Sequence, residues 1–309
     1  MERLLRLALI LAAFGAAGIG ALLLLSAPDR VGPEAFAGLE GDAARGEAVF
    51  NIGGCASCHA APGAEGEARR VLAGGLELVT PFGTFVAPNI SPGPQGIGGW
   101  SLAAFDDAMR RGVSPEGEHY YPAFPWTSYA RMTREDVADL FAFLATLPAS
   151  EAPNAPHRLA FPFTMRRGIG LWKLLYLSPA PVVEVAGAAL ERGRYLVEGP
   201  GHCGECHTPR DEFGGPILAR WLAGGPNPEG KGRIPNLTPD ATGLSWSEAD
   251  IAEYLSSGFT PDYDVAGGAM ADVVKNTALV TAEDRAAIAA YLKAIPPHPT
   301  EAPAGGGGS

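Results

Sequence analysis

The sequence predicts an all-α protein in which two tandem copies of one helical domain follow an N-terminal transmembrane helix. Three observations support this fold class. Five short segments recur in the same order about 147 positions apart. Apolar residues in both copies follow a helical period, and no segment shows convincing strand-like alternation. The first 25 residues contain an uncharged apolar run that is long enough to cross a bilayer.

The composition is that of a globular chain. Hydrophobic residues make up 47% of the 309 positions and charged residues 18%, which is too apolar for a disordered polypeptide. This length is sufficient for two domains of ordinary size. The formal net charge is −11, so no basic surface is expected that would attract nucleic acid, and we exclude nucleic acid as a partner.

The N-terminal segment has the pattern of a membrane anchor. Leu7–Leu25 is apolar and uncharged over 19 residues, close to the roughly 20 that a spanning helix needs and longer than the core of a signal peptide. No convincing cleavage site precedes Pro28, so residues 1–27 are expected to remain as an anchor. Arg3 and Arg6 precede the apolar run and acidic residues follow it. This charge pattern predicts a single-pass inner-membrane protein whose bulk faces the periplasm.

The internal repeat divides the rest of the chain. The segment "CASCH" begins at Cys55, and "CGECH" begins 148 positions later at Cys203. The segment "TREDVADLFAFLATLP" from Thr133 matches "TAEDRAAIAAYLKAIP" from Thr281 at the same offset. Each copy would be about 110 residues long, a common domain size. The expected boundaries are a linker at 28–40, a first domain at 41–148, an inter-domain linker at 149–186, a second domain at 187–297, and a tail at 298–309 that ends in the linker-like "GGGGS".

The last helix of each copy carries start and stop signals. Thr133 and Thr281 are expected to be N-caps, since an aspartate follows each of them three residues later. Pro148 and Pro296 should end these helices. The apolar residues between cap and proline have the i, i+3, i+4, i+7 spacing of one helix face: Val137, Leu140, Phe141 and Leu144 in the first copy, and Ile288, Tyr291, Leu292 and Ile295 in the second.

Each copy also carries one Cys-x-x-Cys-His motif. In such a motif two thiols attach covalently to one haem, and the adjacent imidazole ligates its iron. A zinc site or a thioredoxin-like redox pair is the competing interpretation. Two pairs that are each followed by histidine, each inside a repeated domain, favour haem. We therefore expect two covalently bound haem c groups in two class I cytochrome c domains, with attachment through Cys55, Cys58, Cys203 and Cys206 and iron ligation by His59 and His207.

The second copy offers one methionine as the sixth ligand of its iron. Met270 lies eleven residues before the cap at Thr281, in a stretch that we expect to be an irregular loop. Gly267 and Gly268 would let the backbone approach the haem closely. A thioether opposite a histidine raises the reduction potential. Met270 is therefore the expected sixth ligand of the second haem.

The first copy has no methionine at the corresponding place. The same offset leads to Pro122, two residues before Phe124, and neither side chain can bind iron. Met132 is the nearest soft donor, although its position just before a helix cap also fits a core residue. His119, which would give bis-histidine ligation, and Met165 in the linker are alternatives. The fourth possibility is that the sixth position of the first haem is open or occupied by water.

Two long segments carry a family resemblance. The stretch from "FGTFVAPNISPG" to "YYPAFPWTSYARMTREDVADLFAFL", together with "AMADVVKNTALVTAEDRAAIAAYL", resembles the cytochrome c subunits of periplasmic alcohol, aldehyde and gluconate dehydrogenases over about residues 41–296. The resemblance implies a subunit that passes electrons from a catalytic subunit toward quinone or the respiratory chain. Members of that family typically carry three haems and a methionine in a "YPAMPY"-like segment. This chain has two motifs and Phe124 in that segment, whereas Met270 fits its family position.

Three functions remain open at this point, the third being a largely structural subunit that holds a respiratory complex together while its haems still conduct electrons. The first is an electron carrier that accepts electrons from a dehydrogenase or a respiratory complex and passes them to a terminal oxidase or another cytochrome. The second is a dihaem enzyme, of the peroxidase or thiosulfate-oxidising type, that uses an open first haem as its substrate site. The sequence shows no catalytic base pair, so we assign no catalytic residue and expect the electron carrier.

Overall fold

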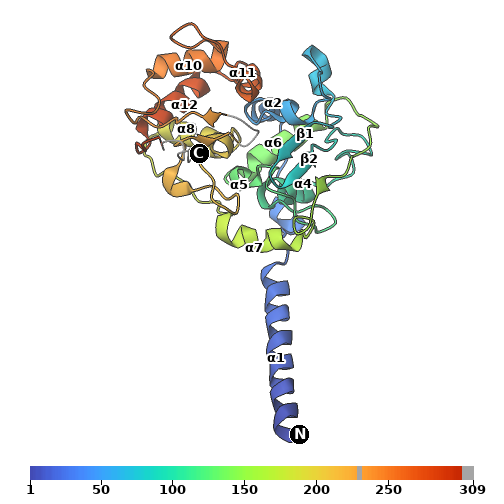
Figure 1. Cartoon of the computed structure of the whole chain (residues 1–309). Coiled ribbons are helices and arrows are strands. Elements are labelled where there is room, and N and C mark those ends of the chain that lie inside the picture. The colour runs from blue at the N-terminus through green and yellow to red at the C-terminus, as the bar shows by residue number, and fades with distance from the viewer. Residues whose placement is uncertain (228–231, 301–309) are drawn as a thin grey trace.

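The computed structural model describes residues 1–227 and 232–300, so most of the expected tail lies outside the described residues. One long helix, α1 (Glu2–Leu25), projects from a body of two lobes (Figure 1). The first lobe contains the 3₁₀ helices η1 (Pro33–Phe36) and η2 (Gly66–Arg70), the helices α2 (Ala43–Ile52), α3 (Cys55–His59), α4 (Leu102–Arg111), α5 (Trp126–Tyr129) and α6 (Arg134–Leu144), and the strands β1 (Glu77–Thr80) and β2 (Gly83–Val86).

The rest of the described chain consists of a connecting segment followed by the second lobe. The connection holds the strand β3 (Arg158–Leu159) and the helix α7 (Arg167–Tyr176). The second lobe holds the helices α8 (Ala188–Glu198), α9 (Gly204–His207), α10 (Glu248–Ser257), α11 (Ala269–Thr277) and α12 (Ala282–Ala294), the 3₁₀ helix η3 (Leu218–Arg220), and the strands β4 (Gly225–Pro226) and β5 (Arg233–Ile234).

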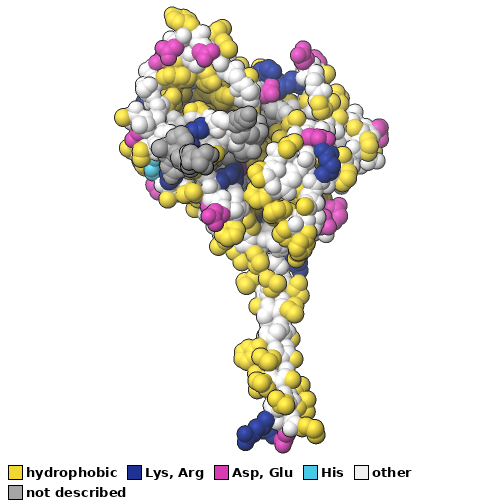
Figure 2. Space-filling model, in the orientation of Figure 1, with side chains coloured by type: hydrophobic (Ala, Val, Ile, Leu, Met, Phe, Trp, Pro, Cys, Tyr) yellow, Lys and Arg dark blue, Asp and Glu magenta, His cyan; other side chains and the backbone are white. Residues whose placement is uncertain are grey.

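The helix α1 does not pack into the core of either lobe. It has 24 residues and none of them is buried. At 1.5 Å per residue it is about 36 Å long, enough to cross the apolar layer of a bilayer. In the described part of the chain it is the one helix that is long and apolar enough to do so. Figure 2 shows hydrophobic side chains along its length and charged ones at its N-terminal end.

The two lobes have the same helix crossing at their centres. α2 packs against α6 in the first lobe, and α8 packs against α12 in the second. A glycine lies at each crossing: a Cβ on Gly46 would meet the Asp139 carbonyl oxygen at 1.9 Å, and one on Gly193 would meet the Ala287 carbonyl oxygen at 2.0 Å. The helices can therefore approach this closely only because the side chain is absent.

The helix signals that we read from the sequence are confirmed. The hydroxyl of Thr133 accepts a hydrogen bond from the Asp136 amide at 3.1 Å, and that of Thr281 accepts one from the Asp284 amide at 3.1 Å. α6 and α12 end shortly before Pro148 and Pro296. The predicted apolar face is buried at all four positions of the second copy and at three of four in the first, where Phe141 is partly buried.

The prediction of an all-α fold is too strict, although the described chain is mostly helical. β1 and β2 form an antiparallel hairpin, and β3 from the connection pairs with β2 as a third strand. β4 and β5 form a smaller ladder in the second lobe. These strands have two to four residues each, which is too short for an alternating pattern to be recognisable in sequence.

The connection packs across both lobes. The Trp172 ring in α7 lies edge-to-face against Trp126 of the first lobe, with ring centroids 5.5 Å apart. The hydroxyl of Tyr176 donates to the Asp211 carboxylate of the second lobe at 2.6 Å. The segment between the lobes is therefore a structural element rather than a free tether.

Candidate haem-attachment sites

Each Cys-x-x-Cys-His motif folds into one short helical turn. α3 contains the whole first motif, and α9 contains the second with Cys203 as its N-cap. A left-handed residue introduces each turn, Gly54 with φ 57° and His202 with φ 39°. Because residues three apart share one side of a helical turn, the two cysteines of each motif project in a similar direction. The sequence thus places two thiols and an imidazole on one short element in each lobe.

The two motif histidines have the same hydrogen bond. His59 Nδ1 lies 2.8 Å from the Pro88 carbonyl oxygen, and His207 Nδ1 lies 2.8 Å from the Pro235 carbonyl oxygen. A carbonyl oxygen can only accept, so Nδ1 carries the proton and donates in both cases. The lone pair of each imidazole then resides on Nε2, which is the arrangement of a metal-ligating histidine. Burial also lowers the pKa of both imidazoles and so favours the neutral form.

The first thiol of each motif is held in its protonated form at neutral pH. Burial raises the pKa of Cys55 and of Cys203 to about 12 each. Zinc sites and reactive redox pairs use thiolates, whose pKa is lowered. Across residues 1–227 and 232–300 no group of three or more His, Cys, Asp or Glu side chains could hold a metal ion, and the cysteines form no disulfide. In each motif, two thiols and an imidazole with a free Nε2 lie on one short turn, which fits thioether attachment and imidazole ligation of one haem.

The expected loop around Met270 is in fact the beginning of a helix. Met270 is the second residue of α11, and Gly268 is the N-cap of that helix with φ 57°. The prediction of an irregular loop is wrong here because a glycine in this conformation allows the chain to turn directly into helical geometry. The side chain of Met270 is partly buried and packs against the core of the second lobe.

The first lobe places Met132 beside its attachment turn. Met132 is 2% exposed and belongs to the core of that lobe. It lines a small cavity, of about 10 Å³, together with Cys55, Met109 and Tyr129. The structure therefore brings the candidate thioether of Met132 and the first thiol of the motif to the same cavity. Phe124 is partly buried and packs against the rings of Tyr120 and Tyr129.

The alternative ligands of the first haem lie elsewhere. His119 is 3% exposed, and both of its ring nitrogens are engaged: Nε2 lies 2.9 Å from the Ser26 carbonyl oxygen and Nδ1 lies 3.0 Å from Lys173 Nζ. These partners belong to the end of α1 and to α7, so the geometry gives bis-histidine ligation no support. Met165 is 58% exposed on the connection between the lobes.

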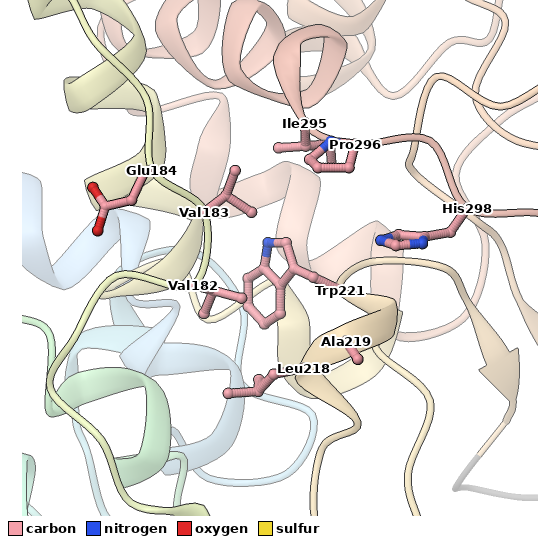
Figure 3. Close-up of a pocket in the computed structure, with 9 residues that line it drawn as sticks. All are labelled: Val182, Val183, Glu184, Leu218, Ala219, Trp221, Ile295, Pro296 and His298. Carbon is pink, nitrogen blue, oxygen red and sulfur yellow. The ribbon is translucent and has the colours of Figure 1, made fainter.

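Another cavity, larger than that of Met132, contains none of the predicted site residues. It has a volume of about 410 Å³ and lies beside the second lobe (Figure 3). The Trp221 ring forms its floor, with Val182 and Val183 on one side and Ile295 and Pro296 on another. The same ring covers the attachment turn, since a Cβ on Gly204 would lie 2.1 Å from it. Trp221 thus separates this cavity from the second motif.

Sequence reasoning missed the contacts that join the two motifs. Glu205, inside the second motif, accepts hydrogen bonds from Thr127 Oγ1 at 2.6 Å and Ser128 Oγ at 2.8 Å in the first lobe. In the opposite direction, Asn276 of the second lobe donates to Ser57 Oγ, inside the first motif, at 2.7 Å. The one available signal was the polar residue between the cysteines of each motif. The two attachment turns therefore face each other across the interface.

His202 belongs to this interface as well. Its Nε2 lies 3.2 Å from the Gly53 carbonyl oxygen, and its ring packs edge-to-face on Tyr129 with centroids 5.7 Å apart. Tyr129 lines the cavity of Cys55, and His202 immediately precedes Cys203. A pair of aromatic rings thus lies between the two motifs.

Comparison with known proteins also indicates a c-type cytochrome with two haems. The family model for cytochrome c matches residues 43–148. A diheme cytochrome c-type protein of Cereibacter sphaeroides is 63% identical over 94% of this chain and 96% of its own length. The cytochrome c subunit of an alcohol dehydrogenase (quinone) from Gluconacetobacter polyoxogenes is 39% identical over 82% of this chain. The fructose dehydrogenase cytochrome subunit of Gluconobacter japonicus is 36% identical over the same share.

The chain covers only 56% and 52% of these two dehydrogenase subunits. It covers nearly the whole diheme relative, and at a much higher identity. The chain belongs to the family of dihaem c-type cytochromes, electron-transfer proteins whose cofactor is covalently bound haem c.

Proposed function

We propose that this protein is a membrane-tethered dihaem cytochrome c that relays electrons from a dehydrogenase or a respiratory complex to another cytochrome or a terminal oxidase. The observation that carries the proposal is the pair of Cys-x-x-Cys-His turns. Each turn holds its histidine with Nδ1 bonded to a proline carbonyl, and the two turns face each other across the lobe interface. The names of the dehydrogenase subunits among the relatives support a dehydrogenase as the donor.

The residues of the two turns would hold the cofactors. Thioether bonds would form at Cys55 and Cys58 and at Cys203 and Cys206, and the imidazole Nε2 atoms of His59 and His207 would ligate iron. Each bound haem supplies an iron that alternates between the ferric and ferrous states. The proline carbonyls orient the imidazoles and increase their basicity, as second-shell acceptors do at other metal-ligating histidines.

Methionines remain the proposed sixth ligands in both lobes. Met270 is the proposed ligand of the second haem because it is partly buried in the second lobe, at the place that the family pattern assigns to a ligand. Met132 is the proposed ligand of the first haem because it lines the same cavity as Cys55. A thioether is a soft, polarizable donor on a flexible side chain and can adjust its position to the iron.

We further propose that the lobes are tandem class I cytochrome c domains that arose by duplication, with boundaries at 41–148 and 187–297. The glycine at each central helix crossing supports this proposal, because Gly46 and Gly193 approach the carbonyls of Asp139 and Ala287, which lie 148 positions apart. An arginine beside each glycine also pairs with an aspartate of the facing helix, although the two aspartates are not equivalent positions of the repeat. Arg45 Nε lies 2.7 Å from the Asp139 carboxylate, and Arg192 Nε lies 2.8 Å from that of Asp284. In both lobes this arginine directly precedes the glycine of the crossing.

The proposed location is the inner membrane, with both lobes in the periplasm. Two features support it: the exposed apolar surface of α1, and the position of Arg3 and Arg6 before the apolar run of that helix, the end that the positive-inside rule places in the cytoplasm. Residues 1–27 would be the anchor and 28–40 the link to the first lobe. The inter-domain segment 149–186 would hold the two lobes in a fixed relation through α7.

A combined measurement of mass and redox behaviour tests the proposal. The purified chain should carry the mass of two haem groups, and variants with both cysteines of one motif replaced by alanine should carry one. In membranes that contain a periplasmic dehydrogenase, the haems should be reduced by its substrate and reoxidised by oxygen through the respiratory chain. Rapid stoichiometric binding of carbon monoxide to the reduced chain, without such turnover, would instead favour a dihaem enzyme.

A further inference from the structure

The helix α7 buries a lysine and exposes leucines, which is the reverse of the usual arrangement in a helix on a water-facing surface. Its lysine points inward: Lys173 is 9% exposed, and its ammonium group donates to the Gly112 carbonyl oxygen at 2.8 Å and to the Arg111 carbonyl oxygen. Two of its leucines point outward, with Leu174 60% and Leu175 72% exposed. A helix in contact with water buries its apolar face, so this outward face is matched to an apolar environment.

The helix α7 is fixed at the end of the membrane helix. The Ser26 carbonyl oxygen, one residue beyond α1, accepts a hydrogen bond from Arg167 at 2.9 Å and one from His119 at 2.9 Å. A Cβ on Gly170 would lie 2.5 Å from the same oxygen, so only glycine lets α7 come this close. Figure 1 shows α7 running across the base of the body beside the end of α1. The position of α7 relative to the end of α1 is therefore fixed by direct contacts.

Other apolar side chains extend the outward face of α7. The residues just before the helix contribute Phe161, Phe163 and Met165, which are 78%, 41% and 58% exposed. The loop that holds Phe213, which is 71% exposed, is bound to α7 by a hydrogen bond from Trp172 Nε1 to the Phe213 carbonyl oxygen at 2.9 Å. We call these exposed residues the base surface: Phe161, Phe163, Met165, Leu174, Leu175 and Phe213. Figure 2 shows hydrophobic side chains gathered where the body meets α1.

We propose that the base surface docks onto the lipid bilayer that holds α1, with α7 lying in the plane of the interfacial layer. The proposal rests on the proposed insertion of α1. An in-plane helix of this kind buries its apolar face at the boundary between headgroups and acyl chains. The contacts to Ser26 place α7 where α1 leaves the apolar layer, so the occupant that the structure favours is lipid. The body then has a fixed orientation on the membrane, and the faces of both lobes away from the base remain open to redox partners.

Spin labels on the full-length haem-loaded chain in phosphatidylcholine–phosphatidylglycerol nanodiscs test this proposal. One label each is placed at Leu175 in the base surface, at Phe14 in α1, and at Leu279, which is 67% exposed in the second lobe outside the base surface. The measurement is the accessibility of each label to oxygen, which concentrates in lipid, relative to an aqueous nickel chelate. We expect the oxygen-to-nickel ratio at Leu175 to exceed that at Leu279 several-fold and to approach that at Phe14.

The Phe14 label separates the two ways in which the experiment can fail. A lipid-like ratio at Phe14 with equal aqueous ratios at Leu175 and Leu279 overturns the docking proposal and leaves the base surface to a protein partner. An aqueous ratio at Phe14 overturns the anchor, and the docking proposal with it. A second measurement needs no label: replacing both Leu174 and Leu175 with asparagine should speed amide exchange of residues 161–176 about tenfold in nanodiscs. Unchanged exchange would contradict the proposal.

Discussion

The carboxylate of Glu205 is predicted to hold the two lobes together. One of its oxygens accepts from Thr127 and Ser128 across the interface, and the other lies 2.6 Å from Arg210 Nη2 in its own lobe. The side chain is 15% exposed, so these partners replace most of its water. Glu205→Gln keeps the shape of the side chain and removes its charge. The substitution therefore tests how much the charge of Glu205 stabilises the interface between the lobes, with little change in packing.

The size of the effect across the interface follows from the two bonds that Glu205 accepts from the first lobe. Hydrogen bonds to a charged group contribute about 1.5–3 kcal/mol each, and neutral ones about 0.5–1.5 kcal/mol. Two inter-lobe bonds change from charged to neutral, so the free energy of unfolding should fall by about 2 kcal/mol. The matched control is Glu184→Gln, because Glu184 is 85% exposed and pairs with Arg194 at 3.5 Å. An exposed pair of this kind contributes about 0–1 kcal/mol.

The effect should also depend on pH in a defined direction. Burial raises the pKa of Glu205, but the charge of Arg210 and the hydrogen bonds from Thr127 and Ser128 outweigh it and hold the pKa below its ordinary value of 4.5. A carboxyl whose pKa is lowered by folding contributes stability above its unfolded pKa and loses it as the pH falls through the folded value. The difference between the native chain and Glu205→Gln should thus be complete at neutral pH and shrink only below about pH 4.5.

Guanidinium chloride unfolding of the haem-loaded chain in detergent measures the stability, and amide exchange in α5 measures the interface locally. We expect Glu205→Gln to lower the denaturation midpoint and to speed exchange in α5, which carries Thr127 and Ser128. The reasoning is refuted if Glu205→Gln and Glu184→Gln have equal effects on both measurements, or if the difference between them is the same at pH 4 and pH 7.

Two pairs of substitutions probe the ligands and the helix crossings. Met270→Leu should abolish the thioether charge-transfer band of the second haem and lower its potential, and Met132→Leu should do the same at the first haem; a variant with an unchanged spectrum and midpoint would remove that methionine as a ligand. Gly46→Ala and Gly193→Ala should each destabilise their own lobe by about 1–3 kcal/mol or more in thermal unfolding, while Gly168→Ala, whose Cβ would meet no atom within 4 Å, should not. Equal melting temperatures for all three glycine variants would contradict the role of the crossings.

The parts of the fold that sequence reasoning predicted are those specified by local signals. A threonine followed three residues later by aspartate is sufficient to mark the caps at Thr133 and Thr281, because the capping hydrogen bond spans only those residues. The apolar spacing after each cap likewise depends on helical geometry alone. The attachment turns are similar, since the spacing of Cys55 and Cys58 requires one turn of helix.

The features that sequence reasoning missed depend on contacts between segments that are distant in the sequence. The pairing of β3 with β2 joins residues more than 70 positions apart, and strands of two to four residues have no period of their own. His119 appeared to be a possible iron ligand because it is close to Phe124 in sequence. Its position is determined instead by Ser26 and Lys173, which approach from the end of α1 and from α7.

The absence of a methionine at Phe124 makes the two haem sites unequal. In the second lobe the candidate ligand lies in the first turn of a helix and is only partly buried, so it can bind iron without leaving a core. In the first lobe Phe124 is packed between two tyrosine rings, and Met132 is a core side chain at 2% exposure. Removing a buried methionine from such a core costs about 2–5 kcal/mol. Any displacement of Met132 toward an iron would forfeit part of this packing, so the iron–thioether bond of the first haem should be the weaker one and the first to break on heating.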